Sequence, residues 1–254
     1  EITIGSRVID GPTFERLCAS GEPIVPFDDA WVILDPAQLA RLPDNLRETG
    51  QLSSAEALRA VLTGTHDGVP VRADARLDMV LEALRNPPDE PVPVDLNATL
   101  RPYQQRGLSW LMTLGRLGLG ACLADDMGLG KTIQVIAHIL ARRPSAAGPS
   151  LVVCPTSVLG NWENELARFA PTLNVTRYHG NARDDEAFHT ADVVLTTYGL
   201  LSRDTDLLAQ TPWDVLALDE AQAIKNPDSQ TARAARSLQA QRRIALTGTP
   251  LENR

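Results

Sequence analysis

Lysine is almost absent from this sequence, and cysteine and aromatic residues are scarce. Lys131 and Lys225 are the only lysines, so arginine carries nearly all of the positive charge. The 3 cysteines lie far apart and form no Cys-x-x-Cys pair, which argues against a zinc site and a disulfide scaffold and favours a reducing compartment. No apolar run approaches the roughly 20 residues that a membrane-spanning helix needs. We therefore expect a cytoplasmic protein with no membrane partner.

The length and the charge distribution limit the possible functions further. The sequence begins at Glu1, which is neither an initiator methionine nor the start of a signal peptide, and we expect a soluble piece of a longer protein. Its 254 residues can bury one large core or two smaller ones. Residues 1–95 hold 8 Arg and 17 Asp or Glu, a net charge of −9, whereas residues 96–254 hold 16 Lys or Arg and 15 Asp or Glu, a net charge of +1. The acidity that would repel nucleic acid therefore belongs to the first part.

Residues 1–95 are predicted to form a small, mostly helical α+β accessory domain and a linker. Start and stop signals predict helices over residues 35–50, 53–64 and 75–88, and short strands are expected within residues 2–9 and 31–34. The stretch NPPDEPVPVDLNA, rich in proline and acidic residues, is typical of a linker. The acidic part is a candidate docking site for a protein partner or for the rest of the chain, and its negative charge would repel any nucleic acid.

Residues 96–254 alternate short apolar runs with helical segments. The runs GACLA, SLVVCP, NVTRYH, DVVLTTY, DVLALDE and RRIALTG predict strands, and helices are predicted over residues 103–117, 132–141, 158–169 and 229–240. This pattern is typical of an α/β domain with a mainly parallel sheet covered by helices on both faces. Ligands of such sheets bind outside the carboxyl ends of the strands. The functional residues are therefore expected directly after these runs.

The first such end carries LADDMGLGKT, which resembles a phosphate-binding loop with one departure. The usual spacing asks for glycine at the position of Asp125. Gly128 and Gly130 allow backbone N–H groups to approach phosphate at a helix N-terminus, Lys131 can reach the β- and γ-phosphates of ATP, and Thr132 can ligate Mg²⁺. Taken alone, the segment also fits a plain glycine-rich turn.

A second strand end carries paired carboxylates. Asp219 and Glu220 follow the apolar run DVLAL, where Asp219 is a candidate magnesium-associated acid and Glu220 a candidate base that orients the attacking water. Taken alone, the pair also fits a solvated helix start. Together with the phosphate loop it predicts a site for ATP and Mg²⁺.

Six motifs in order resemble the first RecA-like lobe of Swi/Snf-type ATPases, in helicase superfamily two. They are LRPYQQRGLSWL, LADDMGLGKTIQ, LVVCPTSVLGNWENEL, VVLTTYGLL, LALDEAQAIKNP and LTGTPLEN, within residues 100–253. Relatives of this type also carry an acidic residue at the position of Asp125. The first part resembles, more weakly, the helicase-associated segment that precedes the motor in bacterial relatives, so the expected location is the bacterial cytoplasm or nucleoid.

The resemblance implies roles for individual residues. Gln104 matches an adenine-sensing glutamine, and Gln222 stands where many relatives have a histidine that bridges a carboxylate and the hydroxyl motif. Trp162 is expected to pack in the core. The resemblance further implies a nucleotide loop of Asp125, Asp126, Met127, Gly128, Leu129, Gly130, Lys131 and Thr132. It implies nucleic-acid contacts at Thr156, Ser157, Thr196 and Thr197, of which Ser157 and Thr197 fit helix capping equally well. It also implies a motif of Thr247, Gly248 and Thr249 that couples the nucleotide site to movement of the lobes.

The implied function is that of one half of an ATP-driven translocase on double-stranded DNA, used in remodelling, transcription-complex recycling or repair. In this family a second RecA-like lobe of the same protein supplies an arginine finger, a role that we do not give to Arg254. We therefore expect residues 1–254 alone to hydrolyse ATP slowly or not at all. The alternatives are a strand-separating DNA or RNA helicase and a regulatory scaffold with a decayed motor; intact Lys131, Thr132, Asp219 and Glu220 argue against the second.

Overall fold

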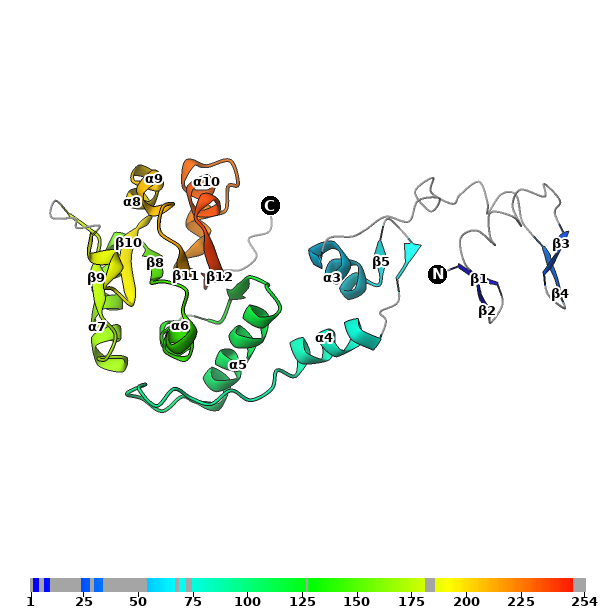
Figure 1. Ribbon diagram of the computed structural model, residues 1–254, viewed down its shortest axis with the longest axis horizontal. Coiled ribbons are helices and arrows are strands. Elements are labelled where there is room, and N and C mark those ends of the chain that lie inside the picture. Colours follow the sequence, from blue (N-terminus) through cyan, green and yellow to red (C-terminus); the bar gives the residue numbers. More distant parts are fainter. Residues whose placement is uncertain are drawn as a thin grey trace. The chain divides into compact units, whose positions relative to one another are not determined.

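The computed structural model describes two compact units. The described residues are 2–4, 7–9, 24–27, 30–33, 54–66, 69–71, 75–126, 128–180 and 186–248. The units are Glu1–Ala73 and Asp74–Arg254 (Figure 1). The second unit therefore begins before residue 96, where the composition places the boundary. Residues before 96 contact this unit: the Glu90 N–H donates to the Ser109 hydroxyl at 3.0 Å, and Val92 packs against the core that contains Leu96 and Leu100.

The described residues of the first unit form three antiparallel strand pairs and one helix. The pairs are β1 (Ile2–Ile4) with β2 (Arg7–Ile9), β3 (Ile24–Phe27) with β4 (Ala30–Ile33), and β5 (Thr65–His66) with β6 (Val69–Pro70). Helix α3 (Ser54–Thr63) ends at Gly64, whose φ of 73° is a left-handed conformation suited to glycine. The helix predicted over residues 35–50 lies outside the described residues.

A six-stranded parallel sheet forms the centre of the second unit. Its strand order is β7-β12-β11-β8-β10-β9, and every neighbouring pair is parallel. The six predicted apolar runs are all strands, which confirms the α/β RecA-like class. Their bounds are β7 Ala121–Leu123, β8 Ser150–Cys154, β9 Val175–Arg177, β10 Val193–Thr197, β11 Trp213–Leu218 and β12 Ala240–Leu246.

Helices cover both faces of this sheet because successive strand residues point to opposite sides. Val152 and Cys154 belong to one apolar cluster with the first group of helices, whereas Leu151 and Val153 belong to a second cluster with the other group. The first group is α5 (Pro102–Arg116), α6 (Lys131–Arg142) and α7 (Leu159–Phe169); the second is α8 (Tyr198–Arg203), α9 (Thr205–Leu208) and α10 (Gln230–Ser237), at the top of Figure 1.

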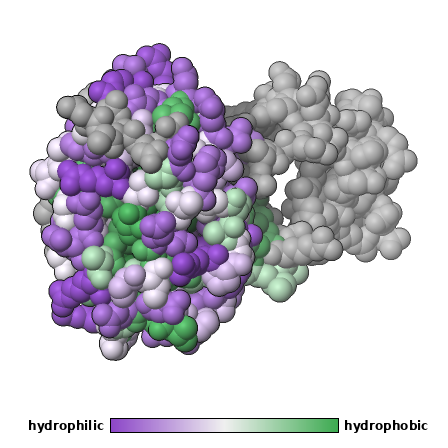
Figure 2. All heavy atoms as spheres, turned by 60° about the vertical axis from the view of Figure 1, so that its left-hand side comes forward, coloured by the Kyte–Doolittle hydropathy of each residue, from purple (hydrophilic) through white to green (hydrophobic). Residues whose placement is uncertain are grey.

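The remaining elements are short. Helix α4 (Ala75–Arg85) precedes the proline-rich segment, and the 3₁₀ turns of the described part of the chain are η2 (Arg143–Ser145), η3 (Thr156–Val158), η4 (Glu186–His189) and η5 (Ala221–Ile224). Helix α10 ends at Ser237, before the predicted end at residue 240, because β12 already begins there. One face of the second unit is largely hydrophilic around a smaller apolar area (Figure 2). Among the described residues, the longest helices are too short and too polar to cross a bilayer.

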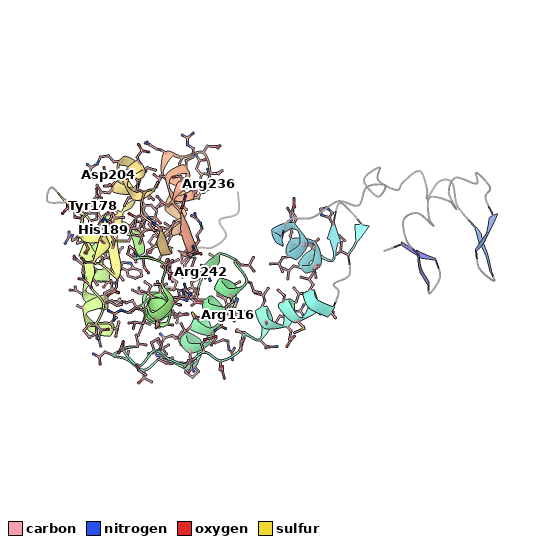
Figure 3. All side chains as sticks on the ribbon, viewed as in Figure 1. Arg116, Tyr178, His189, Asp204, Arg236 and Arg242 are labelled. Atoms are coloured by element: carbon pink, nitrogen blue, oxygen red, sulfur yellow. The ribbon has the colours of Figure 1, made fainter. Side chains whose placement is uncertain are left out.

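A buried ion pair joins α6 to the sheet beside a histidine. Arg142 donates from Nε and from its terminal nitrogen to the two carboxylate oxygens of Asp214, at 3.1 and 2.7 Å, and the Asp214 side chain has no exposed surface. Removing one partner of such a pair typically costs about 3–5 kcal/mol, because the other charge stays buried. His138, one turn earlier in α6, is 1% exposed, and within the described residues neither ring nitrogen has a hydrogen-bond partner. Burial lowers the pKa of His138 to about 4, together with the positive charges of Arg142 and of Arg242, which is labelled in Figure 3, and against the opposing charge of Asp214.

We predict that His138 makes folding stability fall between pH 6.5 and pH 4. The unfolded chain binds this proton near pH 6.5, whereas the folded protein resists it until about pH 4, so acid favours unfolding in that window. Between pH 7.5 and pH 5.0 the wild type should lose about 2 kcal/mol more than His138→Leu. Denaturant unfolding at both pH values measures the difference. The exposed His189, replaced in the same way, is the control, and equal losses in wild type and His138→Leu would contradict the prediction.

Candidate nucleotide site

The loop between β7 and α6 has the backbone of a phosphate cradle. Gly128 and Gly130 have φ values of 84° and 79°, which residues with a Cβ rarely adopt. Lys131 begins α6, and its ammonium donates to the main-chain oxygens of Asp125, at 2.6 Å, and Asp126, at 3.1 Å. Its charge thus lies over the loop, where phosphate oxygens would be bound. Met127 lies outside the described residues.

Asp125, the departure from the usual spacing, is tied to the helix that follows the loop. Gln134 donates from Nε2 to Asp125 Oδ2 at 3.3 Å, and its side chain is buried. A Cβ at Gly107 would lie 1.8 Å from Gln134 Oε1, so glycine in α5 makes room for this amide. The acidic residue is therefore an anchored part of the loop. Gln134 ends the motif LADDMGLGKTIQ, but sequence reasoning gave it no role, because a glutamine within a helix shows no chemistry by itself.

Gln104 packs against the same loop. Its Nε2 donates to the Leu129 carbonyl at 3.1 Å, and its Oε1 accepts from the Arg101 N–H at 2.9 Å. Tyr103 donates from its hydroxyl to the same Leu129 carbonyl, at 3.1 Å. A Cβ at Gly130 would lie 2.5 Å from Gln104 Nε2. Both functions of the Gln104 amide are thus engaged at the loop.

The carboxylates lie at the end of β11. Asp219 Oδ2 accepts a hydrogen bond from the Trp162 indole N–H at 2.8 Å, and Oδ1 accepts one from the Glu220 N–H at 2.9 Å. Burial raises the pKa of Asp219; these two hydrogen bonds lower it, the charge of Glu220 raises it, and the charge of Lys131 lowers it. Lys131 acts electrostatically on Asp219, so the phosphate loop and the paired carboxylates lie in one site although they are far apart in sequence.

A hydrogen-bonded relay connects Glu220 to the end of β12. Gln222 donates from Nε2 to Glu220 Oε2 at 2.6 Å and accepts at Oε1 from the Thr247 hydroxyl at 3.0 Å. Glu220 has a φ of 50°, and among described residues other than glycine it alone has a positive value. Because β12 lies between β7 and β11, Thr247 stands between the phosphate loop and the carboxylates. Thr249 lies outside the described residues.

The four expected nucleic-acid contacts differ in accessibility. Thr156 and Ser157 are exposed in η3, directly after β8. Thr196 is fully buried and donates from its hydroxyl to the Tyr178 carbonyl at 3.1 Å, and Thr197 is 4% exposed. Thr196 and Thr197 thus lie inside the protein, as residues at the end of a strand covered on both faces do, and nucleic-acid contact stays a prediction for all four residues.

The donor chemistry of the site fits Mg²⁺. Within the described residues no group of three or more His, Cys, Asp or Glu side chains gathers as a metal cluster. Mg²⁺ needs no such cluster, because it binds through one or two carboxylates, nucleotide phosphates and water. Asp219 supplies a carboxylate, and Thr132 supplies a hydroxyl in the first turn of α6.

Comparisons with known proteins agree with this geometry. The model of the SNF2-related domain matches residues 103–254, and a model described as SNF2 Helicase protein matches residues 1–62. YwqA of Bacillus subtilis, named as a candidate ATP-dependent helicase/translocase, is 42% identical over 95% of this chain and 29% of its own length. The human chromatin-remodeling ATPase INO80 is 36% identical over 81% of this chain and 14% of its own length.

Solved structures of a related core are also similar. The SWI2/SNF2 ATPase core of Sulfolobus solfataricus in complex with dsDNA is 48% identical, with a TM-score of 0.60 over 64% of this chain and 34% of that chain. A second structure, of the SWI2/SNF2 ATPase core domain from the same organism, is 47% identical, with a TM-score of 0.57 over 63% of this chain and 33% of that chain. This chain thus spans about a third or less of these relatives.

We predict that Gly130→Ala weakens nucleotide binding more than Gly128→Ala does. Each variant places a Cβ at a positive φ, which costs about 1–2 kcal/mol. At Gly128 that Cβ has nothing within 4 Å, whereas at Gly130 it meets Gln104 Nε2 and displaces the amide from the loop. Affinity for a fluorescent ATP analogue, measured with unfolding curves of both variants, checks the difference. Equal affinities in the two variants would show that Gln104 does not support the site.

We also predict that Gln222→Glu slows ATP hydrolysis by about 10- to 100-fold with little change in nucleotide affinity. The variant replaces a donor to Glu220 by a second carboxylate, and a hydrogen bond to a charged group contributes about 1.5–3 kcal/mol. Gln222→His, which keeps a donor, is the matched control and should retain most of the rate. Steady-state turnover and nucleotide affinity of the full-length protein separate the two effects; a full rate in Gln222→Glu would exclude the relay.

Proposed function

The chain belongs to the SNF2-related family, and we propose that it is the ATP-binding lobe of a motor that moves along double-stranded DNA. The observation that carries this proposal is the joint position of three motifs at one edge of the sheet: the phosphate loop, the paired carboxylates and the hydroxyl of Thr247. The relay through Gln222 links the last two. Such a link suits an enzyme in which hydrolysis and movement are coupled.

Nucleotide binding follows from the loop. The N-terminus of α6 and the N–H groups between Gly128 and Lys131 favour an anion. Lys131 exchanges neutral carbonyl partners for phosphate oxygens, and Gln104, already against the loop, lies at the side where we place the base. When bound, Mg²⁺ would be held by Asp219 and Thr132 and would neutralise charge on the β- and γ-phosphates.

Hydrolysis is assigned to Glu220. Its carboxylate accepts a hydrogen bond from Gln222, which fixes one oxygen and leaves the other to orient a water molecule. The positive φ of Glu220 turns the chain away from the direction of β11. Glu220 Oε1 therefore orients the attacking water molecule and accepts its proton. A second lobe of the full-length protein would add an arginine to the γ-phosphate, a contribution of about 10³–10⁵ in rate in related phosphate-loop enzymes.

Double-stranded DNA is the proposed track. The related archaeal ATPase core was solved in complex with dsDNA. Here the exposed hydroxyls of Thr156 and Ser157 are suited to contact a phosphate backbone without reading its sequence. The acidic residues 1–95, by contrast, would repel DNA, and we propose that they dock on the motor or on a protein partner.

A strand-separating helicase is the second candidate function. The observation in its favour is the name of the Bacillus relative, which includes both helicase and translocase. Translocation is preferred because the motifs resemble the Swi/Snf branch throughout. A decayed motor is disfavoured because the relay and the loop contacts are complete.

ATP turnover by the full-length protein tests the proposal. We expect duplex DNA to raise the rate at least about tenfold over no nucleic acid, single-stranded DNA or RNA, and Lys131→Ala to abolish the rate, because it removes the cation that binds phosphate. Glu220→Gln should still bind ATP and is the matched control for folding. Equal turnover under all four conditions would refute the DNA track, and strand displacement on a forked duplex would favour the helicase.

A further inference from the structure

Asp219 is held by aromatic side chains from helices on opposite faces of the sheet. Trp162, in α7, donates from its indole N–H to Asp219 Oδ2 at 2.8 Å. Tyr198, the first residue of α8, donates from its hydroxyl to the Asp219 carbonyl at 2.7 Å. The Asp219 N–H in turn donates to the Val153 carbonyl of β8, at 2.8 Å. Both the side chain and the backbone of the residue are thus positioned by other segments.

Helix α7 directly follows η3, which we expect to face nucleic acid, and α8 directly follows the buried strand end that carries the predicted contacts Thr196 and Thr197. Helix α7 continues from η3, which exposes Thr156 and Ser157. Helix α8 begins directly after β10, so Tyr198 adjoins Thr197. A shift of η3 or of the start of α8 therefore moves a donor of Asp219 with it, since Trp162 is 1% exposed and packed in the core without room to adjust alone.

We propose that Trp162 and Tyr198 are positioning residues that connect the nucleic-acid-facing segments to Asp219, so that DNA binding sets the orientation of its carboxylate. The inference rests on the function proposed above. It deepens that function by naming the contacts through which the DNA segments reach the nucleotide site.

The chemistry of the donors explains why these residue types suit the role. An indole N–H can donate a hydrogen bond but cannot accept one. In Trp162 it therefore serves Asp219 Oδ2 alone and holds that carboxylate oxygen in place. Hydrogen bonds to a charged carboxylate are short and strong, so a displacement of the donor turns the carboxylate with it. Misplacement of a catalytic-site group by about 1 Å can cost about 100-fold in rate. A small movement of α7 is therefore enough to change the rate.

Trp213 provides a matched control within the same chain. Like Trp162, it is 1% exposed, and its indole nitrogen lies 2.8 Å from the oxygen that accepts its hydrogen bond. Its acceptor, however, is the Leu208 carbonyl in the other apolar cluster. Replacing either tryptophan by phenylalanine keeps an aromatic ring and removes one buried hydrogen bond. Only the change at Trp162 alters the surroundings of Asp219.

The first test reads the indole groups without any turnover. In the full-length protein labelled with ¹⁵N-tryptophan, Trp162→Phe and Trp213→Phe assign the two N–H resonances. Addition of a duplex oligonucleotide should shift the Trp162 resonance and leave that of Trp213 in place. An unmoved Trp162 resonance at saturating DNA, with binding followed by fluorescence anisotropy, would overturn the coupling. Absence of binding by the wild type would instead overturn the proposed function, and the coupling with it.

The second test is the DNA stimulation of ATP turnover in the full-length protein. We expect Trp162→Phe to reduce the ratio of DNA-stimulated to basal kcat about tenfold, with the KM for ATP within about twofold of wild type. Tyr198→Phe should reduce the same ratio, and Trp213→Phe should leave it unchanged. A merely structural loss scales both rates by the folded fraction and does not alter the ratio. Equal ratios in wild type, Trp162→Phe and Trp213→Phe would refute the proposal, whereas an unstimulated wild type would refute the proposed function.

Discussion

Burial of the parallel sheet on both faces is the constraint from which the position of the functional residues follows. Because helices cover the two faces, most side chains within the strands are apolar, and most of the polar chemistry lies in the loops at the strand ends. The strand order then decides which loops meet. With β12 between β7 and β11, the hydroxyl of Thr247 lies between the phosphate loop and Glu220. The same burial removes Thr196 from the set of surface residues, although the sequence places it beside a loop.

Local patterns predicted the fold and the main chemistry well, because both depend on short-range information. A run of branched apolar residues followed by glycines and Lys131, or by Asp219 and Glu220, is visible within about ten positions of sequence. The contacts of Trp162 with Asp219, 57 residues away, and of Gln134 with Asp125 are set by packing between elements. Trp162 and Trp213 cannot be told apart from the sequence. Only the structure shows that one indole donates to the Asp219 carboxylate and the other to a backbone carbonyl. The second unit begins earlier than the composition suggests for a related reason, since the contacts of Glu90 and Val92 with this unit do not show in a proline-rich sequence that resembles a free linker.

The site combines strained backbone with dense support. Glu220 adopts a positive φ, and Gly128 and Gly130 do the same in the phosphate loop. For a residue with a Cβ such a conformation costs of order 1–3 kcal/mol and persists only when the surroundings fix it. At Glu220 those surroundings are the hydrogen bond of its own N–H to Asp219 and that of its carboxylate with Gln222. The support on both sides explains how the residue remains in place between a strand and the η5 turn.

Lys131 shows how the loop can be both ordered and ready for phosphate. Its ammonium has two carbonyl partners within the loop, so the cation is already close to its functional position. Carbonyls are neutral, whereas a phosphate oxygen carries negative charge and adds Coulomb attraction to the hydrogen bond. A phosphate therefore competes favourably for the same ammonium, and the exchange needs little movement of the chain. Within the described residues Lys131 forms no ion pair with Asp219, so both groups are available to a nucleotide. The geometry thus separates the cation from the carboxylate until a ligand connects them.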